Sequence, residues 1–290
     1  MTDDTTQSDR GMDSPSRSNL DHITGRVIFA RQENDDTPEV PLPNQPVGAG
    51  HDIKVFDARP LIGELSLDRE GFSLVEHETS VADIRDPEIL RTVYLEEMIP
   101  FIQKQFNASW VVARRHGMYV RSSSVVTAEG GRGAGIRGTA GMAHIDYSAV
   151  AAPMAAGAEC QLQGIPIRSY SRLMVIQAWR AFSPPPQDVP LGLCDGSTLA
   201  DSDIVWRKHI ANNRNEPGST FITGFARYNP AQRWYYFSQM QPNELILFKG
   251  YDSEASCNST PPHTGIQNLD AGPNANVRES VEARFFVYFD

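Results

Sequence analysis

The chain has 290 residues, 40% of them apolar and 21% charged, and a formal net charge of −10 at pH 7. This composition predicts a globular protein with a sizeable core. The excess of acidic residues argues against a nucleic-acid partner, because it repels a phosphate backbone. No run of about 18 apolar residues is present and the N-terminus is polar and acidic, so we expect a soluble, cytoplasmic protein that does not contact a membrane. The three widely spaced cysteines favour neither a disulfide framework nor a zinc knuckle.

Residues 1–22 contain almost no large apolar side chain, so they cannot bury enough surface to offset the entropy of ordering. We expect a disordered tail there and a single domain over residues 23–290. Within that domain, residues 27–29 are strand-like, and the proline-rich residues 34–50 predict an irregular connection.

A helix is predicted to begin at Asp86, a capping residue that precedes Pro87 at the first helical position. Its apolar face would be formed by Leu90, Val93, Tyr94 and Met98. Pro100 is expected to bend or end this helix, because proline removes a helical hydrogen bond.

The rest of the chain is predicted to be mostly β. Short runs rich in β-branched and aromatic residues occupy residues 109–113, 173–176, 234–237, 245–248 and 283–288. Helical signals come early and strands late, with no regular alternation of strand and helix, which argues against a doubly wound sheet. We therefore expect a mainly β fold, a barrel or sandwich flanked by one or two helices.

The pattern of residues 133–138 matches the glycine-rich turn of dinucleotide-binding domains, but that turn requires a preceding strand and a helix that opens at its last glycine. The residues that follow have neither a cap nor helical periodicity. We interpret the segment as a glycine-rich loop at the edge of a site.

Three separated motifs suggest chemistry. In an extended segment His144 and Asp146 share one face, and His263 can join them if the sheet folds back on itself. Two imidazoles and one carboxylate are the ligands of non-haem Fe(II) oxygenases, although a zinc hydrolase uses similar ligands. Arg278 follows at the distance of the next strand, with Ser280 on the same face, and a guanidinium beside a hydroxyl suits a carboxylate.

Ordered matches along the chain resemble the fungal AsaB/CmcJ-like hydroxylase/desaturase family of non-haem Fe(II)/2-oxoglutarate oxygenases, over roughly residues 50–290. The matching motifs lie at residues 57–61, 67–75, 143–147, 179–180, 190–195, 228–237, 248–253, 262–264 and 278–282. The family usually has Asn at the position of Gln177 and Pro at that of Ala181.

The resemblance implies a double-stranded β-helix, also called a jelly roll or cupin-like barrel, that uses Fe(II), 2-oxoglutarate and O2. The implied iron ligands are His144, Asp146 and His263. The implied co-substrate residues are Arg278 and Ser280, together with Gln177 and Arg180.

For the substrate we expect a hydrophobic fungal secondary metabolite, a terpenoid or meroterpenoid, with an amino-acid or peptide-derived metabolite as the alternative. A C–H bond would be hydroxylated, desaturated, cyclised or peroxidised. Candidate substrate and lid residues are Tyr147, Met118 and Trp206, and the candidate lids are residues 130–141 and 198–217.

Two other classes stay open from the residues alone, a zinc-dependent hydrolase or isomerase on a cupin-like barrel and a binding protein without activity. In each class the partner is a small molecule, and a homodimer is left open.

Overall fold

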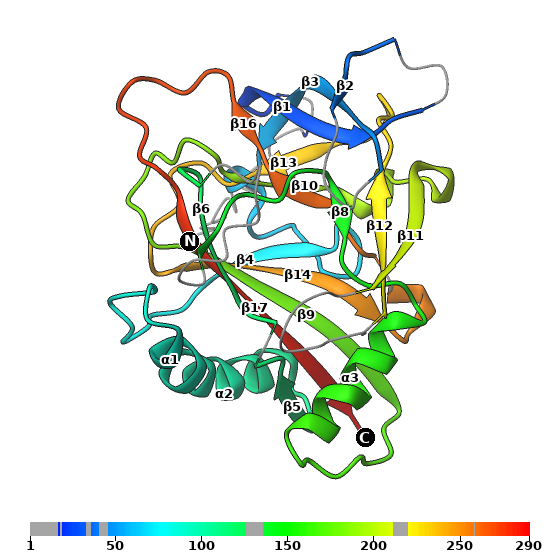
Figure 1. Cartoon of the computed structure of the whole chain (residues 1–290). Coiled ribbons are helices and arrows are strands. Elements are labelled where there is room, and N and C mark those ends of the chain that lie inside the picture. Colours follow the sequence, from blue (N-terminus) through cyan, green and yellow to red (C-terminus); the bar gives the residue numbers. More distant parts are fainter. Residues whose placement is uncertain are drawn as a thin grey trace, which may run out of the picture.

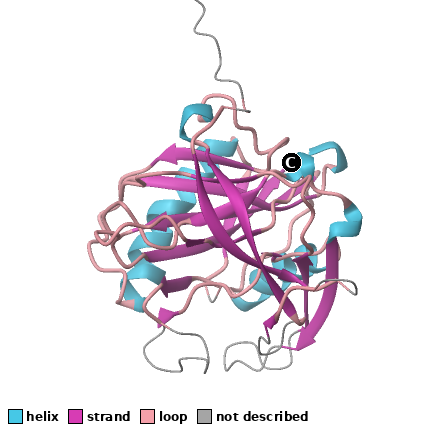
Figure 2. Cartoon of the chain, turned by 90° about the horizontal axis from the view of Figure 1, so that it is seen from above, coloured by secondary structure: helices cyan, strands magenta, loops and turns pink. Residues whose placement is uncertain are grey.

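The computed structural model describes residues 17, 19–32, 36–40, 46–115, 117–125, 136–210, 220–257 and 259–290. In these residues the strands form two sheets, one of ten strands and one of seven, with the helices towards the periphery (Figures 1 and 2). The expected mainly β fold with flanking helices is confirmed.

The ten-stranded sheet A consists of β1 (His22–Ala30), β2 (Glu39–Val40), β3 (Gly48–Asp57), β8 (His144–Ile145), β10 (Leu191–Cys194), β11 (Ile204–Ile210), β12 (Thr220–Ala226), β13 (Trp234–Tyr236), β15 (His263–Gly265) and β16 (Gln267–Asn268). Its strand order is β11-β12-β8-β15-β10-β13-β3-β1-β16, and β2 pairs with β3. All pairs are antiparallel except β13 with β3. This order places β8 and β15, which are more than 100 residues apart in sequence, side by side.

The seven-stranded sheet B consists of β4 (Phe72–Glu76), β5 (Trp110–Ala113), β6 (Tyr119–Ser122), β7 (Ile136–Arg137), β9 (Arg172–Ala181), β14 (Glu244–Asp252) and β17 (Glu279–Phe289). Its order is β4-β14-β9-β17-β6-β7, and β5 pairs with the C-terminal part of β17. The long strands β9 and β17 pair along their whole length and form the centre of the sheet.

The helix predicted after Asp86 is present as α1 (Pro87–Ile89), a π-helical turn (Leu90–Tyr94) and α2 (Leu95–Phe106). The Asp86 carboxylate accepts hydrogen bonds from the backbone N–H groups of Glu88 and Ile89, as expected for a cap. Pro100, which was expected to bend or end the helix, does not end it: the helix continues to Phe106, and Pro100 lies on its exposed side, where water can solvate the carbonyl that loses its partner. One detail of the prediction was wrong. Val93 is 40% exposed and lies off the apolar face, since the π turn shifts the helical phase.

Alternate side chains of β17 point to opposite faces of sheet B, and the two faces have different environments. Val281, Ala283, Phe285 and Val287 belong to the apolar cluster that packs against α2. On the other face, Phe286 and Tyr288 pack with the helix α3 (Ala151–Leu162). The preceding residues of that same face are polar, so one face of β17 changes from charged to aromatic along its length.

The structure adds elements that the sequence did not predict. Helix α3 lies beside the N-terminal end of β9 and the C-terminal end of β17 (Figure 1). Leu20 is buried and β1 begins at His22, so the fold starts a few residues earlier than expected. Residues 198–210, expected to be part of a lid, form the end of one 3₁₀ turn, a second 3₁₀ turn and the paired strand β11. Residues 1–16, 130–135 and 211–217 of the predicted tail and lids lie outside the described residues. The 3₁₀ helices are Arg59–Leu61, Gly196–Thr198, Asp201–Asp203 and Ala255–Cys257.

Strand β7 lies within the glycine-rich pattern, irregular chain and β8 follow it, and no helix opens at Gly138. This agrees with the rejection of a dinucleotide-binding turn. No helix of the described chain is long and apolar enough to cross a membrane.

The packing of β17 against α2 leads to a stability prediction. Phe285 is completely buried in that cluster, so Phe285→Ala is expected to lower the free energy of unfolding in urea by about 3–5 kcal/mol. The matched control Ile89→Ala, at an exposed helical position, should change it by less than about 0.5 kcal/mol. Equal effects of the two substitutions would contradict the placement of α2 on this face.

Candidate metal centre

Two histidines from adjacent strands of sheet A face each other. His144 opens β8, His263 opens β15, and the two residues are direct register partners. Asp146 follows β8 two residues after His144, and alternation brings it to the same side. The structure therefore brings together the three residues that the sequence analysis singled out.

The three side chains converge on one point. Their potential ligand atoms all lie within 4.8 Å of one another, and the imidazole centroids are 4.5 Å apart. His144 Nε2 lies 3.5 Å from Asp146 Oδ1. Two nitrogens and one carboxylate oxygen at such spacing could hold a divalent metal ion.

The hydrogen bonds of the imidazoles leave their Nε2 atoms available. His144 Nδ1 lies 2.8 Å from the carbonyl of Met142, and His263 Nδ1 lies 3.4 Å from that of Pro261, so in both rings the Nδ1–H donates. His263 Nε2 is buried and has no hydrogen-bond partner among the described residues. Burial, together with the neighbouring His144, lowers the pKa of His263 to about 4, which keeps this imidazole neutral at neutral pH. A buried, unprotonated nitrogen without a partner fits a metal ligand.

The carboxylate is held from the opposite sheet by Arg284 of β17, a residue that the sequence analysis missed. Arg284 Nε donates to Asp146 Oδ2 at 3.0 Å, and Nη2 donates to the same oxygen. Oδ1 is therefore the oxygen that faces His144. Although burial alone would raise the pKa of Asp146, the Arg284 guanidinium holds it well below its usual value.

Other polar groups complete the environment of Arg284. Its Nη1 donates to the carbonyl of Gly117 at 2.7 Å, and its Nε also contacts Gln177 Oε1 at 3.1 Å. Glu282 Oε1 lies 2.5 Å from Nη2. Arg284 is thus balanced by two carboxylates and fixed in orientation.

At the N-terminal end of β17 and just before it lie buried donors that have no partner among the described residues. Arg278 is 1% exposed, and its Nε and Nη2 have no hydrogen-bond partner within the described part of the chain; the same holds for Ser280 Oγ. Burial and the nearby Arg121 lower the pKa of Arg278 to about 10, so the guanidinium stays charged at neutral pH. A buried cation with unmade hydrogen bonds, beside a hydroxyl, is suited to a carboxylate ligand.

The two predicted co-substrate residues of β9 have different positions. Gln177 faces the interior and contacts Arg284. Arg180 points to the other face of sheet B, where it donates to the carbonyls of His77 and Pro242 and lies 5.7 Å from the ring centre of Tyr94. Residues 177 and 180 differ by an odd number and so lie on opposite faces of the strand, and the structure therefore does not bring Arg180 together with Gln177.

The candidate substrate residues also lie away from the triad. Tyr147 is buried in the cluster under α3, and its hydroxyl accepts a hydrogen bond from Arg114. Met118 packs against the cluster on the α2 side. Trp206 is 46% exposed. It is the register partner of Gly224, which is in turn the register partner of Ile145, so Trp206 lies on the face of sheet A opposite to His144.

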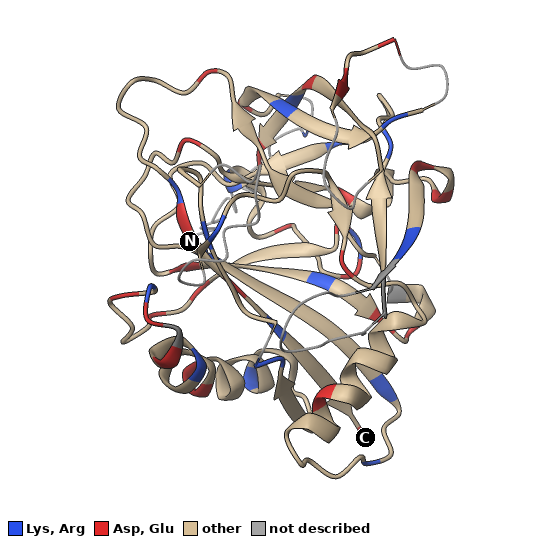
Figure 3. Ribbon diagram, viewed as in Figure 1, with Lys and Arg blue, Asp and Glu red and all other residues tan. Residues whose placement is uncertain are grey.

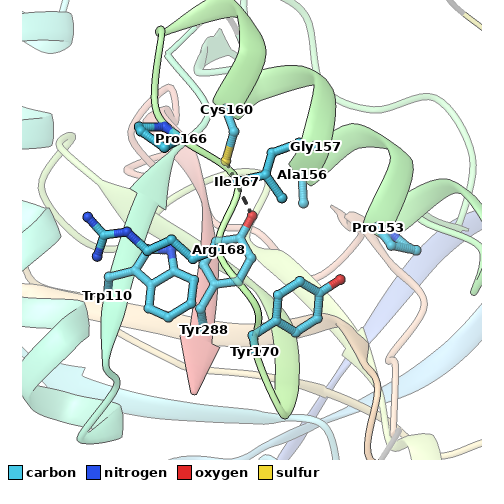
Figure 4. A pocket seen from close by; sticks show the side chains of 10 residues that line it. All are labelled: Trp110, Pro153, Ala156, Gly157, Cys160, Pro166, Ile167, Arg168, Tyr170 and Tyr288. Atoms are coloured by element: carbon cyan, nitrogen blue, oxygen red, sulfur yellow. Dashed lines mark hydrogen bonds between the residues drawn. The ribbon is translucent and has the colours of Figure 1, made fainter. Parts of the chain in front are cut away.

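A separate cavity of about 210 Å³ lies between α3 and the ends of β5 and β17 (Figure 4). Aromatic and aliphatic side chains form most of its wall, including the stacked rings of Trp110 and Tyr288. The Cys160 thiol is 3.6 Å from the Tyr288 hydroxyl, but none of the three candidate metal ligands reaches this cavity. It is distinct from the metal centre.

Comparison with known proteins agrees with this geometry. A family model described as an oxidoreductase/YMDC permease-like domain matches residues 27–288. The hydroxylase/desaturase efuI of Hormonema carpetanum is 30% identical over 82% of this chain and 83% of its own length. The Fe(II)/2-oxoglutarate-dependent dioxygenase nvfI of Aspergillus novofumigatus is 26% identical over 82% of this chain and 83% of its own.

The solved structure of the iron and alpha-ketoglutarate-dependent endoperoxidase NvfI superposes with a TM-score of 0.71, at 21% identity, and covers 92% of this chain and 98% of that one. This likeness confirms the double-stranded β-helix. The fold and the site together place the protein in the class of barrel oxygenases, in which two sheets enclose two histidines and a carboxylate. The chain belongs to the AsaB-type hydroxylase/desaturase family of fungal Fe(II)/2-oxoglutarate oxygenases.

The contact between Arg284 and Asp146 leads to a prediction about metal affinity. Arg284→Gln is expected to weaken the binding of Co(II), a redox-stable probe, by about 10–100-fold in an equilibrium titration, because Asp146 loses the group that orients it. Arg284→Lys, which keeps the charge, should recover part of the loss.

The matched control is Arg172→Gln, which removes a comparable contact with the buried Asp252 far from the triad and should leave the Co(II) affinity unchanged. Wild-type affinity in both Arg284 variants would show that this residue does not position Asp146.

Proposed function

We propose that the chain oxidises a C–H bond of a hydrophobic fungal secondary metabolite, a terpenoid or meroterpenoid. In this proposal His144, Asp146 and His263 bind Fe(II), and Arg278 with Ser280 binds the distal carboxylate of 2-oxoglutarate. The observation that carries it is that two kinds of buried atom have no hydrogen-bond partner among the described residues. These are the neutral Nε2 of His263 and the Nε and Nη2 atoms of the Arg278 guanidinium.

The metal, when bound with 2-oxoglutarate and O2, supplies the oxidant that removes hydrogen from the substrate, and 2-oxoglutarate leaves as succinate and CO2. Side chains of the protein orient a metal ligand, bind the co-substrate and cover the co-substrate arginine. Arg284 holds Asp146 Oδ2 so that Oδ1 is presented to the metal. Arg278 and Ser280 donate to the co-substrate, and Trp179, whose ring centre lies 5.7 Å from the Arg278 guanidinium carbon, covers that cation.

Apolar side chains next to His263 support a hydrophobic substrate. The Phe248 ring centre is 4.6 Å from that of His263, and Leu193 is the register partner of His263 on β10. Such a wall excludes water from the place where a substrate C–H bond must lie. The names of the relatives include hydroxylase, desaturase and endoperoxidase, so all these outcomes fit the family.

The first test is the co-substrate reaction. Purified protein with Fe(II), ascorbate and 2-oxoglutarate is expected to consume O2 and release succinate, with a rise when the substrate is added. The variant His263→Ala should lose both the reaction and metal binding. Metal-dependent turnover that needs neither O2 nor 2-oxoglutarate would instead support the hydrolase or isomerase alternative.

The second test asks which of two arginines, Arg278 or Arg180, binds 2-oxoglutarate. Arg278→Gln is expected to weaken the binding of 2-oxoglutarate at least about 30-fold, since it removes a buried charge-assisted contact, while the Co(II) affinity stays unchanged. Ser280→Ala should weaken it by about fivefold, the value of one ordinary hydrogen bond.

The matched control for this test is Arg180→Gln, on the outer face of sheet B, which should leave the affinity for 2-oxoglutarate unchanged. Loss of 2-oxoglutarate binding in Arg180→Gln but not in Arg278→Gln would overturn the assignment.

A further inference from the structure

Three arginine side chains surround one tyrosine ring on the inner face of sheet B. The guanidinium carbons of Arg137, Arg284 and Arg121 lie 4.3, 4.8 and 5.4 Å from the ring centre of Tyr119. Figure 3 shows both basic and acidic residues on the strands of sheet B, in a chain whose net charge is −10. The positive charge near Tyr119 is therefore local.

Strand register puts this cluster beside the proposed reaction site. Tyr119 pairs with Glu282 and Arg121 pairs with Ser280, so both share the inner face of β17. Arg137 is the register partner of Arg121 on β7 and extends the row to the edge of the sheet. Since Arg284 contacts both the Tyr119 ring and Asp146, the row runs from the metal centre outwards.

Among the described residues, carboxylates balance the charges of this row only in part. Arg284 is matched by Asp146 and Glu282. Arg121 donates to the carbonyl of Gly138 at 2.8 Å, and within the described ranges neither Arg121 nor Arg137 forms a salt bridge with a carboxylate.

Iron and 2-oxoglutarate carry opposite charges of equal size, so their binding leaves this excess in place. Burial lowers the pKa of Arg121, and the neighbouring Arg284 and Arg137 lower it further against the pull of Glu282. Arg121 is partly buried and Arg137 is exposed at the edge of the sheet. A partly buried guanidinium with like-charged neighbours is stabilised when an anion binds to it.

We propose that the substrate is a hydrophobic carboxylic acid, such as a terpenoid acid, whose carboxylate binds Arg121 and Arg137. This inference rests on the proposed function and adds the chemical class of the substrate. The carboxylate lies on the β6–β7 side, and the apolar body extends across the interior towards Phe248 and His263. Anchoring one end of a largely apolar molecule fixes which of its C–H bonds meets the metal.

The test uses a panel of tricyclic to pentacyclic terpenoid carboxylic acids, each paired with its methyl ester. Binding is measured anaerobically through the change that each compound causes in the visible absorption of the enzyme loaded with Fe(II) and 2-oxoglutarate. At least one acid is expected to bind at least tenfold more tightly than its ester. Arg121→Gln and Arg137→Gln should each reduce this preference to less than about threefold, the loss of one charge-assisted contact.

The control is Arg168→Gln. Arg168 also lies over an aromatic ring, that of Trp110, but it lines the separate cavity under α3, so its substitution should keep the acid preference. Esters that bind as well as acids, no binding by any acid at its solubility limit, or an unchanged preference in both Arg121→Gln and Arg137→Gln would overturn the inference.

The same spectra separate this inference from the proposed function. If the absorption of the Fe(II)/2-oxoglutarate complex never develops in the wild type, the proposed function itself fails. If it develops but Arg121→Gln weakens 2-oxoglutarate binding at least tenfold and keeps the acid preference, Arg121 belongs to the co-substrate site and the substrate inference is wrong.

Discussion

The ion pair between Arg284 and Asp146 connects the two halves of the barrel at the point where chemistry is expected. Asp146 follows β8 in sheet A, whereas Arg284 lies in the middle of β17 in sheet B. A buried carboxylate needs a partner, and here the partner also decides which oxygen is free to bind metal. The position of the candidate metal centre relative to the co-substrate row on β17 depends on this contact.

Strand β17 organises the rest of the interior by simple alternation. Its outer face is apolar and packs against α2. Its inner face, which Arg278 directly precedes, carries Ser280, Glu282 and Arg284 before it becomes aromatic under α3. The polar part faces the candidate site and the aromatic part closes the barrel. Because this single strand contributes to the core on one side and to the site on the other, a one-residue register shift would exchange the two environments.

Much of the site could be predicted from local sequence rules. The two-residue spacing of His144 and Asp146 gave their common face, and the expected return of the sheet brought His263 to them. The same rule of alternation would have found Arg284, which lies an even number of residues from Arg278, and would have excluded Arg180. What the sequence could not provide was the partner of each charged side chain across the barrel.

The missed elements have a physical reason as well. Helix α3 contains Pro153 and Gly157, which weaken any sequence-based signal for a helix, and it is stabilised by packing of Ala152, Ala156 and Cys160 on the sheet. Strand β11 contains Ile204, Val205 and Trp206 but is flanked by polar residues, and its pairing with β12 becomes evident only in three dimensions. Tertiary contacts outweigh local propensity at both places.

The most direct measurement is a crystal structure of the protein loaded anaerobically with Fe(II) and 2-oxoglutarate. The account predicts one iron bound by Nε2 of His144, Nε2 of His263 and Oδ1 of Asp146, with Oδ2 still on Arg284 and the distal carboxylate of 2-oxoglutarate on Arg278. Iron bound elsewhere, or 2-oxoglutarate whose distal carboxylate avoids Arg278, would contradict it.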